Sequence, residues 1–233
     1  MTTFVLVHGA WHGGWCWRRV ADLLERRGHK VFAPTLTGLG ERSHLMNGSI
    51  NLDSHITDVV NVLKWEDLSG VVLVGHSYGG WPISGAIEQA FDRIASVVYL
   101  DAFVPEDGQK PLDFASEFAR KGTLEAIAKG DVSRPGPPAA IFHVNDKDQA
   151  WVNGKLTPQP VGVMLQPIKL SGARERLRKK AYIRAPKYPQ LAFDSYYRAK
   201  KADPSWRTYE VLCGHDVMVD MPGELTEILL EVA

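Results

Sequence analysis

The segment 71–80 constrains the fold more than any other stretch of the chain. It reads VVLVGHSYGG, so four aliphatic residues run directly into a Gly-x-Ser-x-Gly motif centred on Ser77. A buried strand, this motif and then a helix together place the serine on a sharp turn at the carboxyl end of the strand. Glycines at 75 and 79 remove side chains that would collide with the backbone there. We therefore expect the Ser77 hydroxyl to stand exposed at the top of a sheet, as a nucleophile would.

Strand-like and helix-like segments alternate on both sides of this motif. Such alternation indicates an α/β fold with a mostly parallel sheet of about six strands flanked by helices. The expected strands lie at 4–7, 31–33, 71–74, 94–100, 180–184 and 207–211. The expected helices lie at 15–27, 52–63, 81–90, 194–202 and 223–232.

The alternation breaks between residues 106 and 178. This stretch is rich in proline and glycine, including Pro-Gly-Pro-Pro at 135–138, and holds only short helical pieces. It is too long for a connecting loop and too irregular for the sheet. We expect a core formed by 1–105 and 179–233, with 106–178 inserted as a helical cap over the carboxyl ends of the strands.

A nucleophilic serine needs a base that is itself oriented by a third group. The candidate base is His215, in the sequence CGHD directly after the last expected strand. The other histidines of the motifs, His8, His12 and His76, come too early for the order serine, acid, histidine. We therefore predict His215 as the base.

The acid is harder to place, because the strand before that of His215 is followed by APKYP at 185–189, which contains no carboxylate. Asp101 ends the strand after the serine motif and would lie at the carboxyl edge of the sheet. Asp194 is the alternative, although aspartate at the start of a helix is typical of an N-cap. We favour Asp101, and Asp194 stays open.

The loop after the first strand, HGAWHGGW at 8–15, completes the expected site. The oxyanion of a tetrahedral intermediate needs N–H donors, and two backbone groups suffice. We predict the N–H groups of Ala10, in this loop, and Tyr78, directly after the serine. Trp11 and Trp81 are expected to line the substrate pocket.

The composition excludes several classes of function. Lysine plus arginine equals aspartate plus glutamate, at 27 each, so no basic excess favours nucleic acid or an anionic membrane as a partner. No apolar run reaches the roughly 18 residues of a membrane-spanning helix. Met1-Thr2-Thr3 leads directly into the first expected strand, so we expect no secretory signal, and the two cysteines, Cys16 and Cys213, have no metal-ligand spacing. We expect a cytoplasmic protein without a metal site; the sequence does not indicate its oligomeric state.

Together these motifs resemble the α/β-hydrolase superfamily, and within it the plant methylesterase and hydroxynitrile-lyase branch with its bacterial carboxylesterase relatives. The motifs that carry the resemblance are FVLVHGAWHGGW at 4–15, VGHSYGG at 74–80 and GHD at 214–216. The resemblance implies a helical cap, a Ser–His–acid triad that uses no cofactor, and Ala10 and Tyr78 as oxyanion donors. We predict a serine hydrolase that cleaves small-molecule carboxylic esters through an acyl-enzyme intermediate. The tryptophan-rich entrance favours hydrophobic or aromatic esters.

The sequence also departs from that branch. Hydroxynitrile lyases carry threonine and lysine where this chain has Gly9 and Asp216, which disfavours cyanohydrin cleavage. The usual aspartate after the penultimate strand is missing, and Asp101 matches hydrolases whose acid has moved to the strand after the nucleophile. Other activities of the same fold remain alternatives: a lactonase, a C–C bond hydrolase, an amidase, a cofactor-free oxygenase or a non-catalytic receptor.

Overall fold

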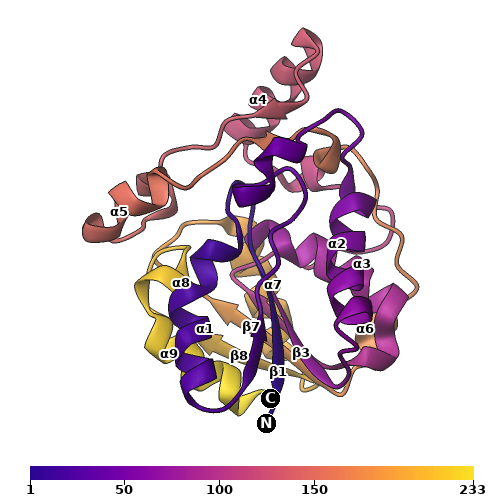
Figure 1. Ribbon diagram of the computed structural model, residues 1–233, viewed down its shortest axis with the longest axis vertical. Helices are drawn as coiled ribbons and strands as arrows, with labels where there is room; N and C mark the ends of the chain where they lie inside the picture. Colours follow the sequence, from indigo (N-terminus) through magenta and orange to yellow (C-terminus); the bar gives the residue numbers. More distant parts are fainter.

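A parallel sheet of six strands forms the centre of the molecule (Figure 1). The computed structural model describes residues 1–233, apart from the side chain of Phe118. The strand order is β2-β1-β3-β4-β7-β8, and every neighbouring pair is parallel. The strands are β1 (Thr3–Val7), β2 (Lys30–Phe32), β3 (Val71–His76), β4 (Ile94–Leu100), β7 (Lys179–Arg184) and β8 (Trp206–Glu210). All six strands predicted from the sequence are present, within two residues of the expected bounds.

Helices cover both faces of the sheet, which explains why the strands are almost continuously apolar. One face carries α1 (Arg18–Arg26), α8 (Val217–Asp220) and α9 (Pro222–Glu231). The other carries α2 (Leu52–Trp65), α3 (Gly80–Ala90) and α7 (Leu191–Ala202). Consecutive residues of a strand point to opposite faces of the sheet, so Val5 of β1 packs into one layer and Leu6 into the other. The sheet therefore separates two hydrophobic cores.

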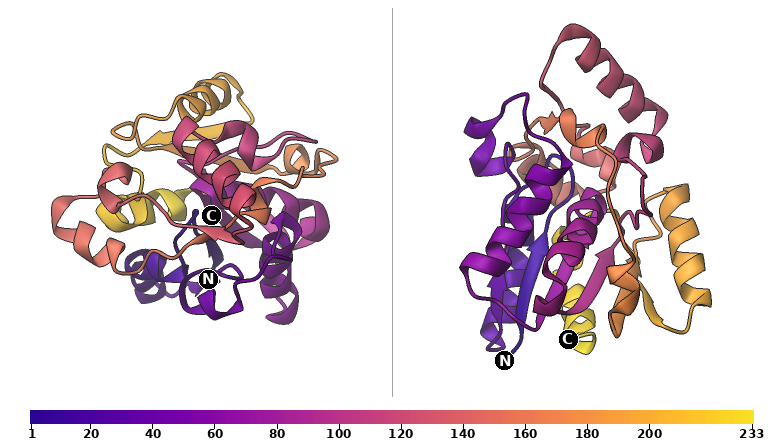
Figure 2. Two further views of the ribbon diagram at one scale, coloured as in Figure 1. Left: turned by 90° about the horizontal axis from the view of Figure 1, so that it is seen from above. Right: turned by 90° about the vertical axis from the view of Figure 1, so that its right-hand side faces the viewer.

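The segment between β4 and β7 contains residues 106–178, which the sequence predicted as an insertion. It holds α4 (Glu117–Lys129), α5 (Asp146–Asn153), α6 (Ala173–Arg176) and a two-stranded antiparallel ribbon of β5 (Ser133–Arg134) and β6 (Gln159–Pro160). The views show α4 and α5 at the end of the molecule opposite the chain termini, beyond the carboxyl ends of the strands (Figures 1 and 2). The last helix, α6, lies instead beside α3, where the Ala173 N–H donates to Glu88.

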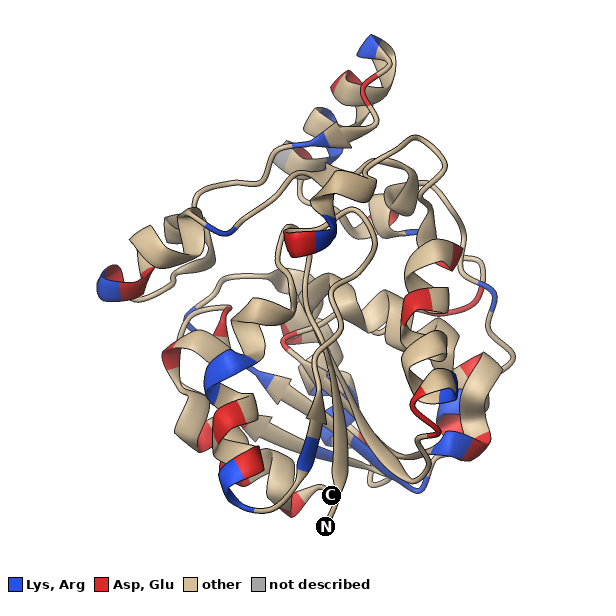
Figure 3. Cartoon of the chain, viewed as in Figure 1, with Lys and Arg blue, Asp and Glu red and all other residues tan. Residues whose placement is uncertain are grey.

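Charged residues of both signs are intermixed along the helices and the insertion (Figure 3). This distribution matches the balanced composition. Within the described residues, no helix combines the length and the apolar character that crossing a bilayer requires.

The turn between β3 and α3 depends on glycines because backbone groups approach it closely. A Cβ at Gly75 would lie 2.7 Å from the carbonyl oxygen of Gly79. A Cβ at Gly79 would lie 2.8 Å from the carbonyl oxygens of Val7 and His8. At Gly80 it would lie only 2.0 Å from the carbonyl oxygen of Phe103. The turn is thus wedged between the segments that follow β1 and β4.

We predict that Gly80→Ala lowers the free energy of unfolding by about 1–3 kcal/mol or more, because the added methyl group overpacks a site bounded by backbone. Urea unfolding followed by circular dichroism measures the change. The matched control is Gly122→Ala in α4, where a Cβ meets no atom within 4 Å. That substitution should stabilise the helix by up to about 1 kcal/mol. Equal stability of Gly80→Ala and wild type would contradict the packing argument.

Candidate active site

Ser77 lies between the end of β3 and the first turn of α3, with a backbone φ of +55°. Non-glycine residues rarely adopt this left-handed conformation, and residues held in it cluster at functional sites. The side chain faces a cavity beneath the insertion, and Ala10, Tyr78 and His215 line the same cavity. The structure thus brings the predicted nucleophile, base and oxyanion donors to one place.

His215 and Asp101 meet beside this cavity. The Nδ1 atom of His215 lies 2.6 Å from Oδ2 of Asp101, and the carboxylate is 0% exposed. His215 lies in the loop after β8, whereas Asp101 directly follows β4. An ionised carboxylate accepts hydrogen bonds only, so Nδ1 carries the proton. The Nε2 atom is then the nitrogen able to accept a proton.

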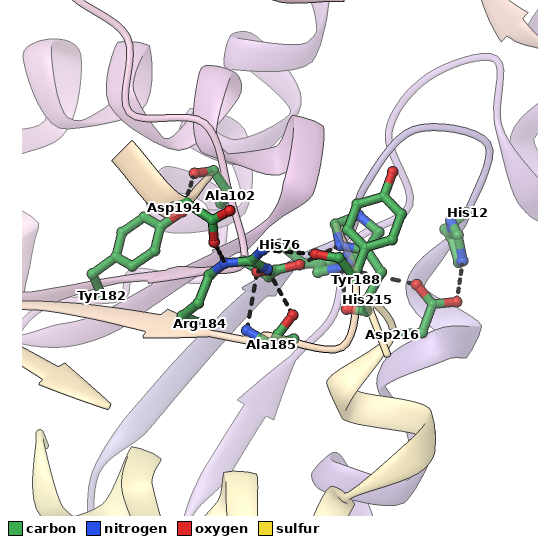
Figure 4. Close-up of polar contacts among 11 residues, drawn as sticks. His12, His76, Ala102, Tyr182, Arg184, Ala185, Tyr188, Asp194, His215 and Asp216 are labelled. Carbon is green, nitrogen blue, oxygen red and sulfur yellow. Dashed lines mark hydrogen bonds and ion pairs between the residues drawn. The ribbon is translucent and has the colours of Figure 1, made fainter. Parts of the chain in front are cut away.

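Two further donors hold the Asp101 carboxylate in place. Its Oδ1 atom accepts from the Arg184 guanidinium at 2.6 Å and from the Ala185 N–H at 3.1 Å. Arg184 is itself 2% exposed, and it also donates to the carbonyl oxygens of Ala185 and Tyr188 (Figure 4). The carboxylate therefore has a fixed orientation toward His215.

Asp194, the alternative acid, does not contact His215. It accepts a hydrogen bond from Nε of Arg184 at 2.9 Å and is 38% exposed (Figure 4). The interpretation of Asp194 as an N-cap was wrong, because α7 begins earlier, at Leu191. The side chain of Gln190 caps it by accepting from the Ala192 N–H.

The loop after β1 packs tightly against the serine turn. A Cβ at Gly9 would lie 2.9 Å from both Nδ1 of His76 and Cβ of Ser77. This close approach brings the neighbouring Ala10 to the cavity. Tyr78 lies in the first helical turn, whose N–H groups lack intrahelical acceptors. The backbone N–H groups of both predicted donors belong to segments that border the serine.

Half of the remaining residues of the cavity wall are aromatic. Trp11 and Trp81, the two residues predicted to line a substrate pocket, are part of this wall. The other large side chains come from segments without a recognisable motif, so sequence reasoning missed them. These are Phe103, Phe114, Arg134, Phe142, Met164, Tyr188, Gln190 and Phe193.

A buried ion pair links the two loops that flank the site, and it was not predicted. Nε2 of His12 lies 3.0 Å from Oδ2 of Asp216 (Figure 4). Nδ1 of His12 lies 2.8 Å from the carbonyl oxygen of Ala10. Both partners are acceptors, so the His12 ring carries two protons. Burial alone would raise the pKa of Asp216, but the charge and hydrogen bond of His12, together with the nearby His76 and His215, lower that pKa to about 2. Burial opposes the charge on His12, yet Asp216 raises its pKa.

No group of three or more histidine, cysteine, aspartate or glutamate side chains is arranged to hold a metal ion in the part of the chain that the structure describes. Cys16 and Cys213 are both buried free thiols.

Three other histidines are buried and neutral. Burial lowers the pKa of His8 to about 3 and that of His55 to about 4, and it lowers the pKa of His76 well below its ordinary value. Their hydrogen bonds match the neutral form: His55 donates from Nε2 to the Thr37 carbonyl and accepts at Nδ1 from the Tyr78 hydroxyl. His55 thus supports the residue that follows the serine.

We predict that these histidines make the fold sensitive to acid. Their pKa values are lower in the folded protein, so the unfolded chain takes up protons first as the pH falls below about 6.5. The free energy of unfolding should decrease from pH 6.5 toward pH 4, by up to about 1.4 kcal/mol per pH unit for each histidine. The pKa of His12 is raised in the folded protein, so its contribution has the opposite sign. As the pH rises above about 6.5, this contribution to the free energy of unfolding should decrease.

Urea unfolding at several pH values measures this slope. His55→Gln should be less stable than wild type at pH 7 but should show a shallower slope, whereas the exposed His44→Gln should keep the wild-type slope. If the free energy of unfolding of His55→Gln kept the wild-type pH dependence, His55 would not contribute to the acid sensitivity of the fold.

Comparisons with known proteins identify the family of the chain. A model described as the alpha/beta hydrolase family matches residues 4–228. A carbendazim hydrolyzing esterase of Nocardioides sp. (strain SG-4G) is 40% identical over 98% of both chains. A putative chloroplastic methylesterase 11 of Arabidopsis thaliana is 29% identical over 99% of this chain and 63% of its own length. A solved extracellular alpha/beta-hydrolase from a Paenibacillus species has a TM-score of 0.86 at 24% identity, covering 100% of this chain and 99% of that one. The chain belongs to the α/β-hydrolase family, as its sequence motifs predicted.

Proposed function

We propose that the chain is a serine esterase that cleaves carboxylic esters through an acyl-enzyme intermediate. The observation that carries this proposal is the 2.6 Å contact between His215 and the buried Asp101, beside a cavity that Ser77 also lines. The similarity to an esterase along the whole chain supports it.

In this mechanism Nε2 of His215 takes the proton of Ser77 as the serine oxygen attacks the ester carbonyl carbon. The N–H groups of Ala10 and Tyr78 stabilise the negative oxygen of the tetrahedral intermediate. His215 returns the proton to the departing alcohol. A water molecule, deprotonated by His215, then releases the acid from Ser77, while Asp101 holds the imidazole tautomer throughout.

The cavity wall favours apolar acyl or alcohol groups. Phe103, Phe114 and Phe142 lie around the serine together with Trp81. Residues 106–178 contribute two of these rings and, in our proposal, act as the cap that excludes water from the reacting ester.

The first test is hydrolysis of p-nitrophenyl acetate and butyrate by wild type and by Ser77→Ala. We expect wild-type turnover and a loss of at least about 10³-fold in the variant, because the nucleophile is removed. A melting temperature near that of wild type would confirm that the variant is folded. Equal rates for the two proteins would contradict the proposal.

A second prediction concerns the acid. Asp101→Asn should lower kcat by about 10²–10⁴-fold, because an amide cannot both orient the imidazole and stabilise its charged form. Asp194→Asn is the matched control, since it removes the second carboxylate bound to Arg184 but leaves His215 untouched; its kcat should stay within a few-fold of wild type. If Asp194→Asn lowered kcat more than Asp101→Asn did, the acid of the triad would be Asp194.

A further inference from the structure

The insertion brings one cation into the cavity wall without a counter-ion. Arg134, in β5, is 5% exposed and lines the cavity that contains Ser77 and His215. Its Nε–H is buried and has no hydrogen-bond partner. Among the carboxylates that the structure describes, none forms an ion pair with it. A buried charge in this state is costly, so the arrangement requires an explanation.

The ring of Trp11 compensates only part of that cost. The guanidinium carbon of Arg134 lies 4.7 Å from the centroid of this ring, which is a cation–π contact. Such a contact uses the flat face of the guanidinium, whereas its N–H donors point outward in the plane. Burial lowers the pKa of Arg134 to about 10, which leaves the group charged at neutral pH. The edge of the cation therefore still needs acceptors.

No aspartate or glutamate lines the cavity, within the part of the chain that the structure describes. Arg134 is the only aspartate, glutamate, lysine or arginine among the residues that line it. The indole N–H groups of Trp11 and Trp81, in the same wall, are likewise buried without acceptors. The wall thus carries one positive charge and no negative one from these residue types, which is the complement of an anionic group.

Hydrogen bonds fix the ribbon that carries Arg134 relative to the reacting atoms. Gln159, the partner of Arg134 across the ribbon of β5 and β6, accepts the Trp11 N–H at 2.9 Å. The Thr157 N–H donates to the Trp11 carbonyl, also at 2.9 Å. Trp11 directly follows the proposed oxyanion donor Ala10, so the ribbon and the oxyanion loop are joined. A group bound at Arg134 would be held at a set distance from Ser77.

We propose that Arg134 binds a carboxylate carried by the ester substrate, so that the preferred substrates are apolar esters with a second, ionised acid group. This inference rests on the esterase proposed above. Two N–H groups of a guanidinium match the two oxygens of a carboxylate, and such pairs are stronger than neutral hydrogen bonds. The carboxylate would supply the missing counter-ion.

Binding tests the proposal without requiring turnover. Isothermal titration calorimetry would measure the Kd of monomethyl glutarate and of 4-acetoxybenzoate for Ser77→Ala and for the double variant Ser77→Ala, Arg134→Gln. The two ligands carry the charge on the acyl and on the alcohol side. We expect at least one of them to bind at least tenfold more weakly to the double variant. Equal affinities for both ligands, or no binding of either to Ser77→Ala, would overturn the proposal.

Kinetics give the second measurement. Each charged ester is compared with a neutral partner, dimethyl glutarate or 4-acetoxybenzamide. The quantity compared is the kcat/KM of the charged ester divided by the kcat/KM of its neutral partner. This ratio should fall at least tenfold in Arg134→Gln, whereas Arg134→Lys should retain part of the preference because it keeps the charge. Arg120→Gln, an exposed charge change on α4, is the matched control and should leave the ratio as in wild type.

The two proposals fail in different ways. If wild type hydrolyses the neutral esters but Arg134→Gln keeps the wild-type ratios, the esterase stands and the carboxylate site is wrong. If wild type binds the charged ligands through Arg134 yet cleaves no ester, the site stands and the proposed activity is wrong.

Discussion

The buried carboxylate of Asp101 is the interaction on which the geometry of the site depends. It accepts hydrogen bonds from His215, Arg184 and Ala185, which belong to the loop after β8, to β7 and to the residue after β7. Burying a charge is costly unless it is paired and hydrogen-bonded, and here three donors share that task. Removing any one of them would leave the carboxylate partly unsatisfied. The same contacts that hold the imidazole therefore also hold three neighbouring segments of the chain together.

A second buried ion pair extends this arrangement toward the oxyanion side. His12 joins the carbonyl of Ala10 to Asp216, which directly follows His215 in the chain. The neighbouring His76 donates to the His215 carbonyl, and its ring lies 4.4 Å from that of His215. The loops after β1 and after β8 are thus tied by polar contacts away from solvent. Low-dielectric surroundings strengthen such contacts and make their loss expensive.

Much of the core could be predicted from the sequence because its signals are local. Strands such as β4 are short aliphatic runs, and Asp101 stood out because it ends one of them while the loop at 185–189 has no carboxylate. The start of α7 was misplaced because aspartate is favoured both at an N-cap and in a first turn, so Asp194 did not fix the boundary. Arg134 and the His12–Asp216 pair could not be predicted, because their roles arise from contacts with residues more than a hundred positions away. No periodic pattern in the insertion indicates which of its residues face inward.

The position of Asp101 on β4 has a consequence for how the site can change. The segment 185–190 lies at the cavity, where Tyr188 and Gln190 form part of the wall, but it contributes no carboxylate to the proposed triad. The segment supports the acid only through its backbone, by the Ala185 N–H and the Tyr188 carbonyl, so the acid and these two wall side chains are encoded by separate stretches of sequence. Substitutions at these two wall positions can reshape the pocket while the acid and its strand stay intact, which leaves this segment open to divergence between related enzymes and to directed evolution.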